Sequence, residues 1–173
     1  MKMADGGFRP AYNVKAATAG DKEGGPRTVI AVDVSNVGSD MNAVPPMLDQ
    51  IEKRTGRLPK TLLADANHAG HAGIKNAAER GVEVLIPVPA RSRTAGPHGD
   101  HDPAIEAWRS RMESAEAKQT YRQRAGLCEL TNAHLRNLGM ERFLVRGIGK
   151  VTCVALMSAL ALNLIAHATA LLS

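Results

Sequence analysis

Aromatic residues and cysteines are both scarce in this sequence. Two Phe, two Tyr and one Trp among 173 residues disfavour a protein that binds single strands by stacking bases on aromatic rings. Cys128 and Cys153 lie 25 positions apart, a spacing unlike that of a zinc site or a disulfide framework. Reduced thiols in a cytoplasm are therefore expected. The N-terminus has no apolar run, so no signal peptide is expected either.

Positive charge is concentrated in one part of the chain. The span from Tyr121 to Lys150 holds six basic and two acidic residues, a net +4 of the +5 carried by the whole chain. Basic side chains neutralise the phosphates of a polyanion, and a carboxylate among them offers the hard oxygen ligand that divalent metals prefer. Phosphate chemistry on a nucleic acid is therefore the first hypothesis.

Apolar runs and helical patterns alternate in the first half of the chain. The pattern predicts a helix through Ile51 capped by Ser39 or Asp40, and another that ends at about Arg80. Strands are predicted over residues 11–17, 28–35, 60–65 and 82–88. This alternation predicts an α/β layer in which the later strands pair in parallel.

The second half of the chain has a different composition. Residues 89–103 are rich in Pro, Gly and charge, which predicts a flexible loop. This loop separates a strand and helix part over residues 1–88 from a helical part over residues 104–173. Three glycines are expected to divide the helical part into about three helices: Gly126, Gly139 and Gly147.

Residues 151–172 contain no charged side chain over 22 positions. The segment is long enough to span a membrane. It is dominated by Ala and Leu but also holds polar residues such as Asn163 and His167. This mixture favours a helix in a protein core or a subunit interface over a membrane span.

Asp65 stands at the end of a short apolar strand, KTLLAD. Polar groups at the carboxyl ends of strands in an open α/β sheet face the crevice where ligands bind, so Asp65 is a candidate metal ligand. An Asp in this position would equally well cap the turn that follows it. Both interpretations stay open from the residues alone.

Glu129 lies on a predicted helix with several polar neighbours. At about 100° per residue, one arc of roughly 140° collects a hydroxyl, an amide, two guanidiniums and this carboxylate. Its members are Tyr121, Arg124, Glu129, Asn132 and Arg136. The alternative is a solvated helix with incidental charges.

Two histidine pairs have a spacing found among metal ligands, His68 with His71 and His98 with His101. No thiolate or carboxylate set accompanies them in a zinc pattern. Structural or solvated roles are therefore favoured for all four.

The Asp65 and Glu129 segments together resemble the catalytic core of DDE-type insertion-sequence transposases, in the branch with a Tyr-Arg-Glu-Lys signature. The resemblance rests on LLADANHAG and on a helix reading Tyr-x2-Arg-x4-Glu-x6-Arg. It extends to GGFRPAYNVKAAT, to VDVSNVGSDMNAVPPMLDQIEKRTGRLP and to RFLVRGIGKVTCVALMSALALNLI. It covers almost the whole chain.

The resemblance implies a ribonuclease-H-like mixed sheet with flanking helices and a helical C-terminus. In such enzymes two Asp and one Glu bind two divalent metals, Mg²⁺ or Mn²⁺, which activate the attacking hydroxyl and stabilise the leaving oxygen. By resemblance Asp65 is the second Asp and Glu129 is the Glu, and both are metal ligands. Tyr121 and Arg124 match the signature, whereas Arg136 stands where Lys is usual and so keeps the charge but alters the geometry.

The resemblance also implies partners and a location. Double-stranded DNA, as transposon ends and target, is the expected ligand, together with self-association and no membrane. The expected location is the bacterial cytoplasm, at the nucleoid. The DNA-binding and signature residues are Tyr121, Arg124, Arg136, Arg142, Arg146 and Lys150.

Two departures from the family pattern shape the functional expectation. Asn67 and His68 follow the second Asp, where Gly-Tyr or Gly-Phe is common. The first Asp belongs several dozen residues before the lead-in strand, and Asp33 and Asp40 lie in segments that match noncatalytic parts of the family. The expectation is a C-terminal fragment without the first strand and first metal ligand, inactive by itself. The alternatives are a noncatalytic DNA-binding or assembly remnant and a pseudogene product without a stable fold.

Overall fold

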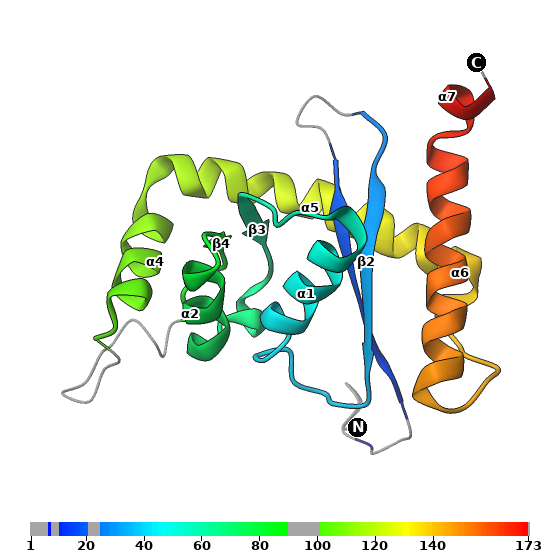
Figure 1. Cartoon of the computed structure of the whole chain (residues 1–173), viewed down its shortest axis with the longest axis horizontal. Coiled ribbons are helices and arrows are strands. Elements are labelled where there is room, and N and C mark those ends of the chain that lie inside the picture. Colours follow the sequence, from blue (N-terminus) through cyan, green and yellow to red (C-terminus); the bar gives the residue numbers. More distant parts are fainter. Residues whose placement is uncertain (1–6, 8–10, 21–24, 90–100, 173) are drawn as a thin grey trace. The chain divides into compact units, whose positions relative to one another are not determined.

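The computed structural model describes residues 7, 11–20, 25–89 and 101–172. The chain forms two compact units (Figure 1). One, called the hairpin unit, combines Met1–Gly38 with Ala125–Ser173. The other, called the central unit, is Ser39–Arg124. The boundary between them falls inside the helix α5, Ala115–Leu135.

The hairpin unit is built on two antiparallel strands, β1 and β2. Val14 pairs with Val34 and Ala16 with Val32, and the register shifts between Ala17 and Thr18. Its elements are β1 Asn13–Ala19, β2 Thr28–Ser35, the second part of α5, the π-helical segment η2 Arg136–Met140, α6 Ile148–Ala166 and α7 Ala168–Leu172.

The core of the hairpin unit lies between β2 and α6, which run alongside each other in Figure 1. Val29 and Val32 of β2 are buried against Ala155 and Ala159 of α6. Alanines on the helix let its backbone approach the strand closely, and the larger valines fill the space between them. Partly buried neighbours complete the cluster: Val14, Ala16, Val34, Met140, Leu156 and Leu162.

Polar contacts also hold α6 against β2. The Asn163 side chain bonds Val29 twice: its Oδ1 accepts the backbone N–H at 2.8 Å, and its Nδ2 donates to the carbonyl oxygen at 2.9 Å. The Nε2 of His167 lies 2.7 Å from the hydroxyl of Thr28. One side-chain amide thus satisfies both backbone groups of a buried strand residue.

Replacing Asn163 with Ala is expected to destabilise the protein by about 2 kcal/mol or more, because a buried N–H and a buried C=O of Val29 lose their partners. Asn163→Asp keeps an acceptor for the N–H but no donor for the carbonyl, so we expect an intermediate loss. Urea unfolding followed by circular dichroism measures both. Equal midpoints for wild type and both variants would contradict this role of the amide.

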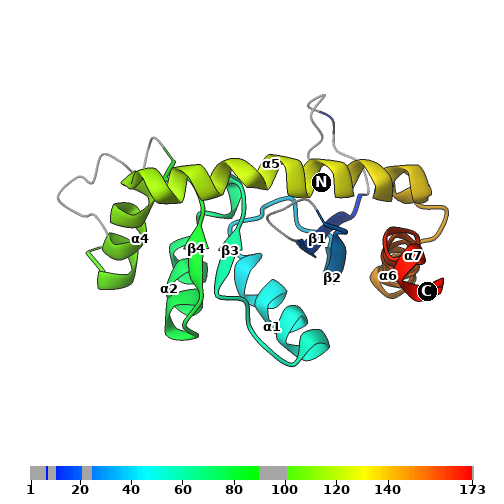
Figure 2. The ribbon, with the colours of Figure 1, turned by 90° about the horizontal axis from the view of Figure 1, so that it is seen from above.

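The central unit is built on two short parallel strands, β3 and β4, which Figure 2 shows side by side. Leu62 pairs with Val84 and Leu63 with Leu85. Its elements are α1 Val44–Thr55, β3 Thr61–Leu63, the 3₁₀ turn η1 Ala66–His68, α2 His71–Glu79, β4 Glu83–Leu85, α4 Pro103–Glu113 and the first part of α5.

Trp108 anchors the core of the central unit. Its side chain is 1% exposed, and its Nε1 donates to the carbonyl oxygen of Ile86 at 2.9 Å. The bond joins α4 to the chain just after β4, and it satisfies the polar end of a large apolar ring. Other fully buried side chains of this unit are Val44, Leu48, Ile74, Val84 and Ile105.

The structure confirms an α/β organisation with parallel pairing of the later strands. The described residues hold two two-stranded sheets. Each of the four predicted strands occurs, although β3 and β4 are shorter than the apolar runs that predicted them. Most of the loop predicted over residues 89–103 lies outside the described residues.

Three details of the sequence prediction are wrong. The first helix is preceded by Ala43 and has no side-chain cap; its second and third residues, Pro45 and Pro46, have no backbone N–H that a cap could bind. Gly126 does not end a helix: it lies inside α5, and the break between helices comes at Ser114 instead. The uncharged segment is two helices, because the chain leaves α6 at His167.

Among the described residues, α6 is the one helix whose length and composition would allow it to cross a membrane. Its Ala155 and Ala159 are buried against β2, however, and Asn163 is bonded to Val29. One side of α6 therefore packs in a protein core, as the sequence predicted.

Candidate active site and nucleic-acid interface

Asp65 follows β3 at the carboxyl end of the parallel pair. Its Oδ1 accepts from the backbone N–H of Asn67 at 2.9 Å and from Nδ1 of His68 at the same distance. Asp65 therefore caps η1, as one of the two sequence interpretations predicted. The cap fixes the carboxylate at the strand end and leaves its second oxygen to other contacts.

That second oxygen contacts Arg124 of α5. The guanidinium Nη2 lies 3.3 Å from Oδ2 of Asp65, although the two residues are 59 positions apart. Both side chains are only partly exposed, Asp65 by 37% and Arg124 by 25%. The Nε of Arg124 has no hydrogen-bond partner among the described residues. The central unit thus brings together Asp65 and Arg124, two of the residues that the sequence analysis selected as site candidates.

The environment keeps Asp65 ionised. Partial burial by itself would raise the pKa of this carboxyl, but the hydrogen bond and charge of His68 outweigh it, with help from the Asn67 amide and the Arg124 charge. The pKa consequently lies below its ordinary value. At neutral pH the side chain is an anion that can bind a metal or a cationic group.

The turn that carries Asp65 is held against a neighbouring loop. Gly70 is buried, and a Cβ built on it would lie on the carbonyl oxygen of Met41 and 2.9 Å from the carbonyl carbon. Its φ of −73° is open to any residue, so the requirement for glycine is one of space and not of conformation. Close backbone contact at Gly70 therefore fixes where α2 begins after the Asp65 turn.

The other signature residues lie on α5 and beyond it. Tyr121 is half-buried in the central unit, while Glu129 is exposed on the part of α5 that belongs to the hairpin unit. Arg136 begins η2, where Leu138 and Gly139 leave helical geometry. Asp65 and Glu129 belong to different units, and the proximity that a shared role as metal ligands would require stays a prediction.

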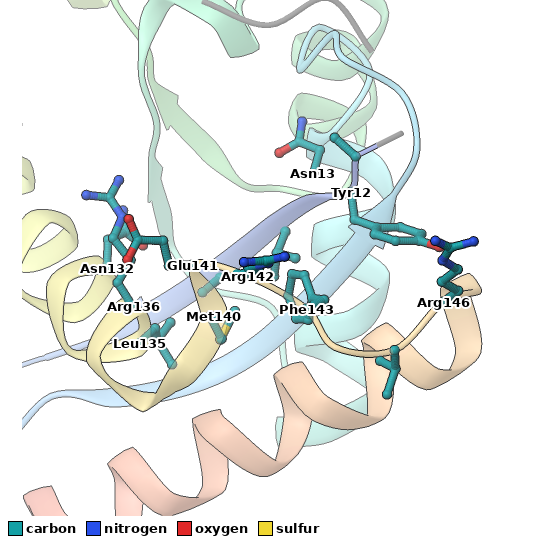
Figure 3. A pocket seen from close by; sticks show the side chains of 14 residues that line it. Tyr12, Asn13, Asn132, Leu135, Arg136, Met140, Glu141, Arg142, Phe143 and Arg146 are labelled. Atoms are coloured by element: carbon teal, nitrogen blue, oxygen red, sulfur yellow. The ribbon is translucent and has the colours of Figure 1, made fainter. Parts of the chain in front are cut away.

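An open groove of about 930 Å³ runs along the hairpin unit. Three of the predicted DNA-binding arginines line it, and in the view of Figure 3 Arg142 lies between Arg136 and Arg146. We call it the arginine groove. Its other polar lining residues are Tyr12, Asn13, Asn132 and Glu141. Three guanidiniums against one carboxylate make a surface suited to phosphates.

The wall of the arginine groove is rigid at Tyr12. The phenol oxygen accepts from the backbone N–H of Gly147 at 2.7 Å, and the ring meets Phe143 edge to face with centroids 6.3 Å apart. Gly147 has a φ of 93° and precedes α6 directly. The segment that carries Arg142 and Arg146 lies outside helices and strands, and this bond ties its end to Tyr12, the residue just before β1.

The remaining predicted residues take up separate positions. Lys150 is exposed in the first turn of α6 and does not line the arginine groove. The ring of His71 packs edge to face with Trp108, with centroids 6.2 Å apart, and Nδ1 of His101 lies 3.4 Å from a Glu106 carboxylate oxygen. His98 lies outside the described residues.

Of the two predicted metal ligands, Asp65 has the charge and the donor atoms that a divalent metal requires. Asp65 is an ionised carboxylate, the hard oxygen donor that Mg²⁺ and Mn²⁺ prefer. Over the described ranges, no three His, Cys, Asp or Glu side chains gather closely enough to hold a metal ion. In the central unit, Asp65 is the predicted metal ligand that the structure describes.

Tyr12 and Asn13 line the groove, although the sequence did not predict them as site residues. The signal was weak, since both lie at the start of a strand and their polar ends carry no recognisable spacing. Asn163 was recognised as a polar residue of an apolar segment, but the sequence did not show that its side chain would bond the backbone of Val29.

Comparison with known proteins identifies the family. The model of the family described as "Transposase DDE domain" matches residues 4–164, nearly the whole chain. Comparison with curated proteins and with solved structures returned no match. Members of the matching family act on DNA and generally use divalent metal ions. On this match, the chain belongs to the family of transposases with a DDE domain.

Proposed function

We propose that the chain acts in DNA transposition by metal-dependent phosphodiester cleavage and strand transfer, with Asp65 and Glu129 as two of the three metal-binding carboxylates. The observation that carries this proposal is the contact between Asp65 and Arg124 at 3.3 Å. Two residues of the family pattern, far apart in sequence, meet at the end of a parallel strand. A ribonuclease-H-like sheet and the Tyr-Arg-Glu-Lys branch are part of the same proposal.

Each residue has a distinct role in this proposal. Asp65, ionised and held by its own turn, and Glu129, on α5, bind the divalent ions, Mg²⁺ or Mn²⁺ as a pair. When bound, such ions activate the attacking hydroxyl and stabilise the leaving oxygen. Arg124 donates one hydrogen bond, from Nη2, to Asp65. Its guanidinium has further N–H donors that can bind a phosphate beside Asp65. We assign no residue of this chain to the third carboxylate, and we expect no cleavage by these 173 residues alone.

The arginine groove is the proposed surface for double-stranded DNA, at the bacterial nucleoid. Arg136, Arg142 and Arg146 line one continuous hollow. Planar guanidiniums bind phosphate oxygens in pairs, and the fixed Tyr12 wall supports the segment that carries two of them. Lys150 extends the charge beyond the groove.

A noncatalytic DNA-binding or assembly protein is the second candidate. It is favoured by one observation, that no three metal-ligating side chains cluster in the part of the chain that the structure describes. Under this alternative the arginine groove binds DNA, and Asp65 serves only as the cap of η1. The two candidates share DNA binding and differ in metal-dependent cleavage.

Reversing the charge of Arg142 and Arg146 is expected to weaken DNA binding. The affinity that remains is expected to depend less on salt concentration. Two lost phosphate contacts lower the slope of log affinity against log salt concentration by about 2, since each contact contributes about 0.9. Fluorescence anisotropy with a labelled duplex, titrated at several salt concentrations, measures the slope.

The matched control reverses two cations at the end of α1, Lys53 and Arg54, which are exposed and far from the groove in sequence. Its net charge change is the same, so the general field of the protein changes equally. If both double variants lower the slope by the same amount, the arginine groove is not the surface that meets DNA.

A further inference from the structure

We infer that His68 is a positioning residue of the metal site: its ring holds one oxygen of the Asp65 carboxylate, so that a divalent ion is bound through the other oxygen. This role of His68 rests on the proposed function, in which Asp65 is a metal ligand. His68 is a residue by which the chain departs from the family pattern, since Tyr or Phe is common at its position. Neither of those side chains has a hydrogen-bond donor where the imidazole carries Nδ1.

One oxygen of Asp65 is fully occupied within its own turn. An oxygen of an ionised carboxylate has about two lone pairs with which to accept hydrogen bonds. Oδ1 lies 2.9 Å from the backbone nitrogen of Asn67 and 2.9 Å from Nδ1 of His68. Because both bonds end on the same oxygen, Oδ2 is the one that remains for a metal. Asp65 is therefore expected to bind an ion through a single oxygen.

The direction of the ring bond follows from the charge of Asp65. Partial burial by itself would raise the pKa of the carboxyl, but the hydrogen bond and charge of His68 are the largest opposing contributions, and the pKa lies below its ordinary value. An ionised carboxylate can only accept hydrogen bonds. Nδ1 of His68 is therefore the donor. A bond of this kind to a charged group is roughly twice as strong as one between neutral groups.

The backbone of His68 is fixed on both sides of the ring. Its N–H donates to the carbonyl oxygen of Asp65 at 3.0 Å, and its own carbonyl oxygen accepts from the N–H of Gly70 at 2.8 Å. Gly70 in turn lies directly against the backbone of Met41. The His68 side chain is 20% exposed. A ring on so constrained a backbone loses little further freedom when it holds the carboxylate.

The contact with Arg124 shows what His68 prevents. Arginine commonly binds a carboxylate through two parallel N–H···O bonds, one to each oxygen. Here Nη2 of Arg124 reaches Oδ2 alone, at 3.3 Å, which is longer than most N–H···O bonds. With Oδ1 held by the turn, Arg124 does not close over both oxygens. An ion that approaches Oδ2 therefore competes with one long hydrogen bond and not with a two-point ion pair.

Metal binding by the full 173-residue chain tests this role, with Mn²⁺ alone as the probe. Mn²⁺ broadens the NMR signals of nearby amides, so the amides of residues 66–68 report on an ion at Asp65. His68→Phe keeps a ring but removes the donor. It is expected to raise the Mn²⁺ dissociation constant about tenfold or more, as when other hydrogen-bond partners of metal ligands are removed. His68→Asn loses the ring but keeps an amide donor near the position of Nδ1, and is expected to retain most of the affinity.

The two variants separate the donor from the packing of the ring. Wild-type affinity in His68→Phe would overturn the inference, as would a loss in His68→Asn equal to that in His68→Phe. The matched control is His134→Phe, the same substitution at an exposed residue of α5, which is expected to leave Mn²⁺ binding unchanged. An equal effect of the control would likewise show that the contact with Asp65 is not responsible.

Asp65→Asn separates the role of His68 from the proposed function. The amide keeps an acceptor for the cap of η1 but removes the charge, so the broadening at residues 66–68 is expected to disappear. If it persists, or if the wild type shows none, Asp65 does not bind metal in this chain, and the proposed metal site fails together with the role of His68. If it disappears while His68→Phe binds as the wild type does, the proposed metal ligand stands and only the role of His68 is refuted.

The hydrogen on the ring has a test that needs no metal. Nitrogen NMR of the His68 imidazole distinguishes a ring nitrogen that carries hydrogen from one that does not. The hydrogen-bearing type is expected at Nδ1. The other type at Nδ1 would show that the ring does not donate to Asp65, and would overturn the inference.

Discussion

Glu129→Gln is expected to lower metal-dependent nicking of supercoiled DNA by about a thousandfold or more, in a chain to which an N-terminal segment carrying the family's first Asp is joined in frame. The loss is large because the amide is a poor ligand for Mg²⁺ or Mn²⁺, and phosphodiester cleavage by a two-metal site depends on both ions. Conversion of supercoiled to open-circular plasmid measures the rate. The 173 residues without that segment are expected to show no nicking.

Glu129 tests the site more cleanly than Asp65, whose carboxylate also caps η1. The control is Glu116→Gln, an exposed acid in the first turn of the same helix, which should keep full activity. If the 173-residue chain nicks DNA by itself and Glu129→Gln abolishes the reaction, an acid within the chain supplies the third ligand. Asp33 would then be the nearest candidate.

Gly70→Ala is expected to destabilise the protein by about 3 kcal/mol or more, the upper range for inserting an atom into close-packed surroundings. The new Cβ would collide with the Met41 backbone, which cannot rotate away as a side chain can. For a chain of this size the loss corresponds to a fall in Tm of about 6–12 °C. Thermal unfolding followed by circular dichroism measures it.

Gly126→Ala is the matched control for this substitution. Gly126 lies in the middle of α5, is exposed, and has no atom within 4 Å of a Cβ built on it. Alanine there is expected to stabilise the protein by about 0.5–1 kcal/mol, because glycine costs a helix conformational entropy. Equal destabilisation by both variants would show that the close contact at Gly70 does not limit stability.

The regular parts of the fold follow from the apolar pattern of the sequence. Alternation and β-branched residues predict β2 over residues 28–35, which are its bounds in the structure, and the apolar run after Gly81 predicts β4. The helix through Ile51 was likewise predicted, and α1 buries Val44, Met47 and Ile51 on one side. In each case a periodic signal reflects burial on one side of a strand or helix.

Other features depend on contacts between residues distant in sequence, which no periodic pattern encodes. The contact of Arg124 with Asp65 and the bond from Gly147 to Tyr12 arise when separate elements pack together. The helix end predicted at Gly126 was wrong for a local reason. Glycine lowers the stability of a helix, but α5 continues through Gly126 because the helical turns on either side hold its backbone. Gly139 and Gly147, in contrast, have positive φ values and lie where the helical part is interrupted.

The amide of Asn163 has a consequence for solubility as well as for stability. A β-strand with free backbone groups on its outer side can recruit the strand of another molecule and start aggregation. At Val29 that position is filled from within the chain, because Asn163 presents one donor and one acceptor, as a neighbouring peptide group would. Strand addition to β2 at this position would have to displace the Asn163 side chain first.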